Sequence, residues 1–152
     1  VLALSGAGNL AGSLAVAAAA HYAQVLPAGG AAAAHAAAGA AAKCALPPGV
    51  MFIKGIGANW LVGVAIFQAT VASTAAGKVA ALWMPIATFV ALGLEHSVAN
   101  MFLLPFGAMC GADIGTADIM GNLGPVAAGN FVGAALLVGG LQRFSVLGRW
   151  RG

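Results

Sequence analysis

Charged side chains are almost missing from this chain of 152 residues. Lys, Arg, Asp and Glu make up 6% of it, whereas about 25% is usual for a soluble globular protein. Hydrophobic residues make up 62%. So few charges cannot solvate the surface of a soluble domain. The composition therefore indicates an integral membrane protein whose partner is the lipid bilayer, and it predicts an all-α fold because helices satisfy their own backbone in lipid.

The sequence also lacks the patterns that are typical of several other functional classes. The six Lys and Arg residues form no cluster with interleaved polar side chains, which argues against a nucleic-acid partner. Two cysteines, Cys44 and Cys110, lie far apart and in no metal or redox spacing, so we expect no metal site and no cofactor. The sequence predicts a transport protein that is not an enzyme.

Long uncharged intervals predict the membrane crossings. A spanning helix needs about 20 apolar residues. We therefore expect one membrane domain over residues 1–152, with crossings at about 1–26, 55–77, 79–112 and 119–142. A single helix over 79–112 would be about 50 Å long, well beyond a hydrocarbon core of about 30 Å. The third crossing should therefore be broken, near 95–96.

The segments around the crossings carry two further predictions. The alanine-rich segment 31–42 is too short to span, and we expect a short helix at the membrane edge that ends at Pro47-Pro48. Alternate crossings place Lys43 and Lys54 on one side of the membrane. The cations on the other side are Lys78, Arg143, Arg149 and Arg151. The positive-inside rule then predicts that both ends of this chain are cytoplasmic.

A short repeat links the first and fourth crossings, which run in opposite directions. Gly8-Asn9-Leu10-Ala11-Gly12 recurs as Gly129-Asn130-Phe131-Val132-Gly133. This is the pattern expected of an inverted repeat. The alternative is that small residues four apart recur in any closely packed membrane helix. Asn in lipid is costly unless it is hydrogen-bonded, so Asn9 and Asn130 are candidate structural polar residues.

Glu95, His96 and Asn100 form the candidate polar site at the centre of the third crossing. An ionisable pair at mid-membrane is expected to face a cavity or polar partners. If the helix resumes at His96, Asn100 lies one turn on, on the same face. Histidine suits proton handling, because its unperturbed pKa is near 6.5; the alternative is a His satisfied in a helix interface. For Glu95 we favour a structural anchor over a second proton carrier, with Asn9 and Asn130 as candidate donors.

Three segments, in this order and at this separation, resemble the formate/nitrite transporter family. They are Asn59-Trp60-Leu61-Val62, residues 89–102 around Glu95-His96-Ser97, and residues 125–133. Residues 40–47 also resemble the segment before the fourth helix of the family. The resemblance implies an aquaporin-like inverted-repeat bundle with six crossings per protomer and five protomers, in which the second and fifth helices are broken.

The same resemblance implies roles for particular residues. The family passes small monovalent weak-acid anions such as formate and nitrite. His96 would be the pore histidine, Asn100 its companion, Phe89 a constriction side chain and Lys43 the entrance lysine. The four crossings would be family helices three to six. The first two helices, and with them half of the pore wall, are then absent, so we expect these residues to be part of a longer protomer that forms a homopentamer.

Two other functions stay open at this point. A neutral-solute channel for ammonia or water fits an inverted repeat, although the Asn-Pro-Ala pair of aquaporins is missing. A haem-binding membrane electron carrier would use His21 or His35 together with His96. Proton-linked anion transport is favoured, since a weak acid can cross an apolar pore in its neutral form whereas a bare anion faces a desolvation cost of many kcal/mol.

Overall fold

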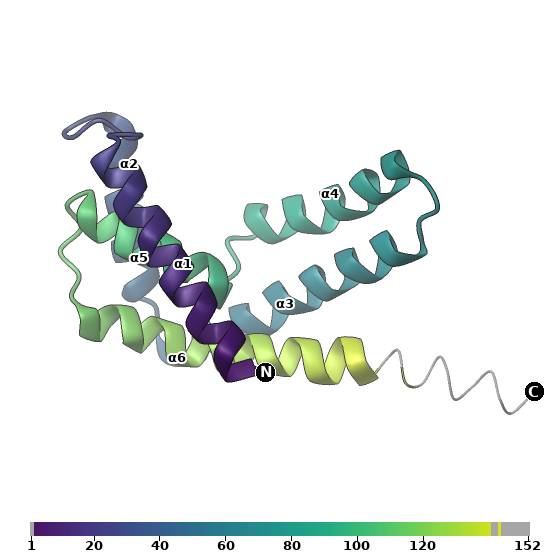
Figure 1. Ribbon diagram of the computed structural model, residues 1–152. Helices are drawn as coiled ribbons and strands as arrows, with labels where there is room; N and C mark the ends of the chain where they lie inside the picture. Colours follow the sequence, from purple (N-terminus) through teal and green to yellow (C-terminus); the bar gives the residue numbers. More distant parts are fainter. Residues whose placement is uncertain (1, 141–142, 144–152) are drawn as a thin grey trace, which may run out of the picture. The chain divides into compact units, whose positions relative to one another are not determined.

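Every regular element in the described part of the chain is a helix. The computed structural model describes residues 2–140 and residue 143, and it contains no strand over this range (Figure 1). In chain order the elements are α1 (Leu2–Tyr22), α2 (Ala31–Cys44), α3 (Pro48–Val71), α4 (Ala75–Ala91), α5 (Ser97–Met109), α6 (Thr116–Val132) and the π-helix η1 (Gly133–Val138) that continues α6. The all-α prediction is confirmed.

Three of these segments are long and apolar enough to cross a membrane: Ala3–Tyr22, Pro48–Val71 and Thr116–Val138. Helices α4 and α5 are also apolar but have only 17 and 13 residues. At 1.5 Å per residue they are about 26 Å and 20 Å long, so each is shorter than a hydrocarbon core of about 30 Å. Residues 92–96 separate them, which is where the sequence places a break.

The helix ends differ from the charge-bounded intervals of the sequence analysis. Helix α3 begins at Pro48 and ends at Val71, rather than covering 55–77. The difference arises because Lys54 and Lys78, which were used as boundaries, both lie inside helices. Proline is favoured at the first helical position, where its missing N–H costs nothing, and this explains the start at Pro48. The end of the fourth interval, at Gln142, lies outside the described residues.

The chain packs as two compact units. Counting the described residues alone, the first comprises 2–48 and Ser97–Pro125, and the second comprises Gly49–His96 together with the residues from Val126 onward. In the first unit, α5 packs against both α1 and α2. A Cβ atom on Gly107 of α5 would lie 2.9 Å from the Ala36 carbonyl oxygen and would overlap Ala40, so glycine is needed for this close approach. Phe102 and Phe106 stack at 5.2 Å between ring centroids.

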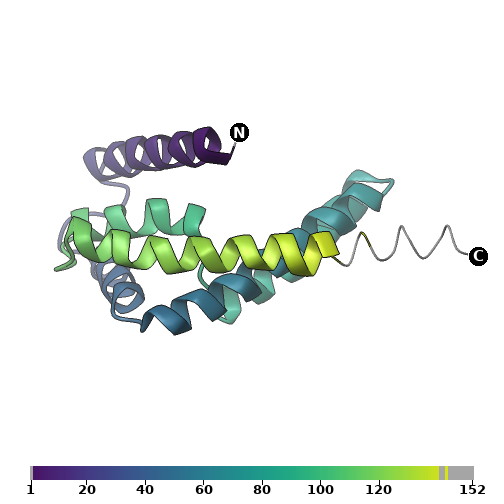
Figure 2. The ribbon, with the colours of Figure 1, turned by 90° about the horizontal axis from the view of Figure 1, so that it is seen from below.

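The second unit contains a helical hairpin of α3 and α4, with the C-terminal part of α6 and η1 beside α3 (Figure 2). Thr74 caps the start of α4, since its hydroxyl accepts from the Gly77 N–H at 3.0 Å. Met51, Ala58 and Ala65 of α3 are buried, as is Val126 of α6. Helices α3 and α6 therefore pack together, and both contact the segment that follows α4.

Candidate functional site

The break after α4 begins with a hydrogen-bonded turn that requires glycine. Gly93 has φ of 59°, a left-handed conformation that glycine adopts without strain. Its N–H donates to the Val90 carbonyl at 3.0 Å, and the Leu94 N–H donates to the Phe89 carbonyl at 3.2 Å. These two bonds are those of a Schellman motif, which satisfies the last carbonyls of a helix and turns the chain away from its axis.

Lys54 of α3 holds the turning point of this break. Its Nζ donates to the Gly93 carbonyl oxygen at 3.2 Å. A cation at the C-terminal end of a helix also interacts favourably with the helix dipole of α4. From the sequence, Lys54 is an outer cation that bounds a crossing and could attract an anion towards the entrance, with ordinary interfacial snorkelling as the alternative. The structure gives it a different contact, because α3 starts before Lys54 and carries the side chain alongside the end of α4.

Asn130 of α6 holds the next part of the break. Its Nδ2 donates to the Gly55 carbonyl at 2.8 Å and to the Glu95 carbonyl at 3.0 Å. The carbonyl oxygen of Asn130 in turn accepts from Asn59 Nδ2 at 2.8 Å. The sequence offered Asn130 as a donor to Glu95. In the structure it reaches the main-chain oxygen of Glu95, so Asn130 orders the backbone at the break.

Asn130 reaches across because α3 and α6 approach very closely. Gly55, Gly129 and Gly133 form the contact, and a Cβ atom on any of them would be too near a main-chain oxygen. The oxygens are those of Val126 (2.7 Å from a Gly55 Cβ), Phe52 (overlapping a Gly129 Cβ) and Ile56 (overlapping a Gly133 Cβ). Small residues allow such approach in membrane helices.

The first copy of the repeat is different. A Cβ on Gly8 or Gly12 would meet nothing within 4 Å among the described residues.

Glu95 and His96 lie at the end of the break, just before α5. Glu95 is 1% exposed, and His96 is half-buried. The His96 ring meets the Phe89 ring edge-on, with 6.1 Å between centroids and 69° between planes. Helix α5 begins at Ser97, one residue later than the resumption considered from the sequence. The segment thus presents an imidazole beside an aromatic ring, on a backbone held by Lys54 and Asn130.

A second polar group lies in the first unit and joins three helices. Asn100 of α5 donates from Nδ2 to Asn122 Oδ1 at 2.8 Å. Asn122 of α6 donates from Nδ2 to the Lys43 carbonyl oxygen at 3.0 Å, near the end of α2. Asn100 and Asn122 are both 0% exposed. Asn100 and Lys43 were predicted from the sequence as site residues, whereas Asn122, which connects them, was not.

Lys54, Asn59 and Asn122 are therefore additions to the predicted set. For the two asparagines a sequence signal existed, because an Asn within an apolar interval needs a partner wherever it occurs. Only Asn9 and Asn130 were predicted on this ground. Asn9 is exposed on α1 and makes no side-chain hydrogen bond within the described residues, so its structural role stays a prediction. Arg149 and Arg151, used for the orientation, lie outside the described residues.

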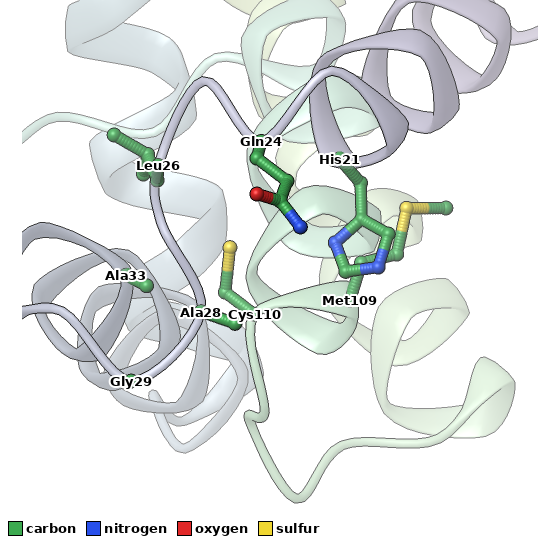
Figure 3. Close-up of a pocket in the computed structure, with 8 residues that line it drawn as sticks. All are labelled: His21, Gln24, Leu26, Ala28, Gly29, Ala33, Met109 and Cys110. Atoms are coloured by element: carbon green, nitrogen blue, oxygen red, sulfur yellow. The ribbon is translucent and has the colours of Figure 1, made fainter.

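A small cavity of about 170 Å³ lies where the α1–α2 connection passes the end of α5. His21, Gln24, Met109 and Cys110 contribute side chains to its lining (Figure 3). Gln24 has φ of 50°, which is uncommon for a residue other than glycine. His35 is exposed on α2. No group of three His, Cys, Asp or Glu residues suited to a metal ion occurs in the part of the chain that the structure describes.

Known proteins that resemble the chain are membrane transporters and channels. A solved chain described as an FNT family ion channel superposes with a TM-score of 0.84 and 31% identity, over 91% of this chain and 55% of its own length. A pentameric formate channel with formate bound gives a TM-score of 0.81 and 31% identity, over 92% of this chain and 63% of its own.

The sequence comparisons agree. A probable formate transporter of Methanothermobacter thermautotrophicus is 43% identical over 96 residues, which are 63% of this chain and 35% of that relative. The chain thus spans about a third of the length of the first curated relatives it matches. The model of one family, described as formate/nitrite transporter, matches residues 1–144, and the chain therefore belongs to the formate/nitrite transporter family.

Proposed function

We propose that the whole protein carries small monovalent weak-acid anions of the formate or nitrite type, with a proton, across a lipid bilayer. One observation carries the proposal. An ionisable pair, Glu95 and His96, interrupts an otherwise apolar pair of helices, and the interruption is ordered by hydrogen bonds from Lys54 and Asn130. The similar proteins include one described as a probable formate transporter and a formate channel with formate bound, and these support the same class of solute.

His96 is proposed as the proton-handling residue of the pore. A bare anion entering an apolar constriction would lose its hydration at a cost of many kcal/mol, whereas the neutral acid would not. Phe89, edge-on to the imidazole, supplies an apolar wall beside it. We propose that His96 donates or relays the proton that neutralises the anion, and that Phe89 favours the neutral form.

The other predicted residues take supporting roles. Lys43 is proposed to attract anions at the entrance, and its half-buried position leaves part of the side chain accessible. Asn100 is proposed as the polar companion of His96, four residues further along the chain. Glu95 is proposed as a structural anchor, since its side chain is almost completely buried. Both ends of this chain are proposed to be cytoplasmic, and the assembly is proposed to be a homopentamer like the formate channel it resembles.

The experiment that tests this function compares solutes side by side. The whole natural protein is reconstituted in proteoliposomes, and uptake of formate, nitrite and ammonia is measured at equal gradients. We expect formate or nitrite uptake to exceed that of protein-free liposomes and to change the internal pH in step with the anion. Ammonia uptake without anion uptake would establish the neutral-solute channel instead. A Soret band in the purified protein without any flux would favour the haem-binding alternative.

A further inference from the structure

We infer that Asn122 is a positioning residue that fixes the entrance lysine, Lys43, for its encounter with the anion. The inference rests on the proposed entrance role of Lys43. It comes from the hydrogen bonds that join Lys43, Asn122 and Asn100 within the first unit. Asn122 does not itself touch the anion in this account, and it acts through the main chain of Lys43.

The carbonyl oxygen of Lys43 lacks the main-chain hydrogen bond that a continuing helix would give it. Within an α-helix this oxygen would accept from the N–H four residues later. That residue is Pro47, which has no N–H to donate. The Leu46 N–H approaches the same oxygen only at 3.4 Å. Asn122 Nδ2, at 3.0 Å, therefore supplies the shorter hydrogen bond at the position where the proline removed one.

Asn100 fixes which way the Asn122 amide points. An asparagine amide carries an acceptor oxygen on one side and a donor nitrogen on the other. Because Oδ1 of Asn122 accepts from Asn100 Nδ2 at 2.8 Å, its Nδ2 is turned toward Lys43. Both asparagines are 0% exposed, so water does not compete for these bonds. The amide pair thus forms an oriented link from α5 through α6 to the end of α2.

This link ties the entrance residue to the helix that directly follows His96. Lys43 is the penultimate residue of α2, at a point where the chain turns toward α3. A fixed main chain at Lys43 limits the volume that its ammonium group can sample. Loss of the link would leave the charge in place but would let it spread over more positions, so anions would be attracted less effectively at low concentration.

A double-mutant cycle tests the inference on the whole natural protein in proteoliposomes. We measure the formate concentration for half-maximal uptake, together with maximal uptake, at low ionic strength. Lys43→Ala should raise the half-saturating concentration about threefold, in the range expected for one partly exposed charge. Asn122→Ala should raise it by a smaller factor, because the Lys43 charge stays in place, and maximal uptake should stay within about twofold. A larger fall in maximal uptake would overturn the inference, because it would show that the change acts through Asn100, which Asn122 also contacts.

The decisive comparison is Asn122→Ala in the Lys43→Ala background. If Asn122 acts through Lys43, the second change should then have almost no further effect on half-saturation. An equal factor in both backgrounds, or no effect of Asn122→Ala with Lys43 present, would overturn the inference. If Lys43→Ala alone leaves the half-saturating concentration unchanged, the entrance role in the proposed function is wrong. If Lys43→Ala raises that concentration but Asn122→Ala has the same effect with and without Lys43, the entrance role stands and only the inference about Asn122 is wrong.

Two controls keep the result interpretable. Gln68→Ala removes an exposed amide of α3 that makes no side-chain hydrogen bond among the described residues, and it should leave half-saturation unchanged. Size-exclusion chromatography reports whether each variant assembles. Should Asn122→Ala fail to assemble, Asn122→Ser replaces it in the cycle, because a hydroxyl fills part of the site but is too short to reach both partners. The same non-additivity with Lys43→Ala is expected.

Discussion

Replacing Asn130 by alanine should destabilise the protein by about 2–3 kcal/mol. The side chain is 5% exposed and donates to two main-chain oxygens. The Gly55 oxygen lies inside α3 and keeps its intrahelical partner, so its loss should be near the average of about 0.6 kcal/mol for hydrogen bonds between membrane helices. The Glu95 oxygen lies in the break, where a buried acceptor left without its donor costs about 1–3 kcal/mol.

The assay is reversible unfolding of the whole protein in mixed micelles. The measured quantity is the proportion of denaturing detergent at which half of the protein is unfolded. Gln68→Ala is the matched control, because it removes an amide of similar size that is exposed on α3. Asn130→Ala should shift the midpoint strongly, and Gln68→Ala should shift it little. A loss below about 0.5 kcal/mol for Asn130→Ala, the usual size of a surface substitution, would refute the reasoning that the break is ordered by this amide.

Three further predictions concern packing, backbone and orientation. Gly129→Val should lower the free energy of unfolding by at least about 1–3 kcal/mol, the usual cost of overpacking, because its side chain would overlap the Phe52 carbonyl. An unchanged free energy of unfolding would contradict the close approach of α3 and α6. Gly93→Ala should cost about 1–2 kcal/mol through its φ of 59° alone, since a Cβ there meets nothing within 4 Å. In a variant without native cysteines, Lys43→Cys should react with an impermeant thiol reagent in intact cells and Arg149→Cys should not; the reverse labelling would overturn the orientation.

The broken helix could be predicted from the sequence because its causes are local. An ionisable pair at mid-membrane and an apolar interval too long for one helix are both visible along the chain. The end of α2 was likewise predictable from Pro47-Pro48, since proline cannot continue the hydrogen-bond ladder. In each case the residues that cause the feature lie within a few positions of it.

The partners of the break could not be predicted in the same way. Lys54 was used as the boundary of a crossing, because an unpaired cation inside a membrane helix is unfavourable. It lies within α3 and donates to Gly93, which is 39 residues away in the chain. Asn122 and Lys43 are separated by 79 residues. Such pairs depend on helix packing, and a single sequence gives the need for a partner but not its identity.

The most direct test of the central claim is the pH dependence of formate uptake by His96→Phe. Phenylalanine keeps the bulk of the imidazole beside Phe89 but cannot donate or accept a proton. Uptake by the whole natural protein is measured in proteoliposomes between about pH 5 and pH 8, the range in which histidine commonly titrates. The account predicts that His96→Phe assembles normally and loses, or strongly changes, the pH dependence of the wild type. An unchanged rate and pH profile would contradict a proton-handling role for His96.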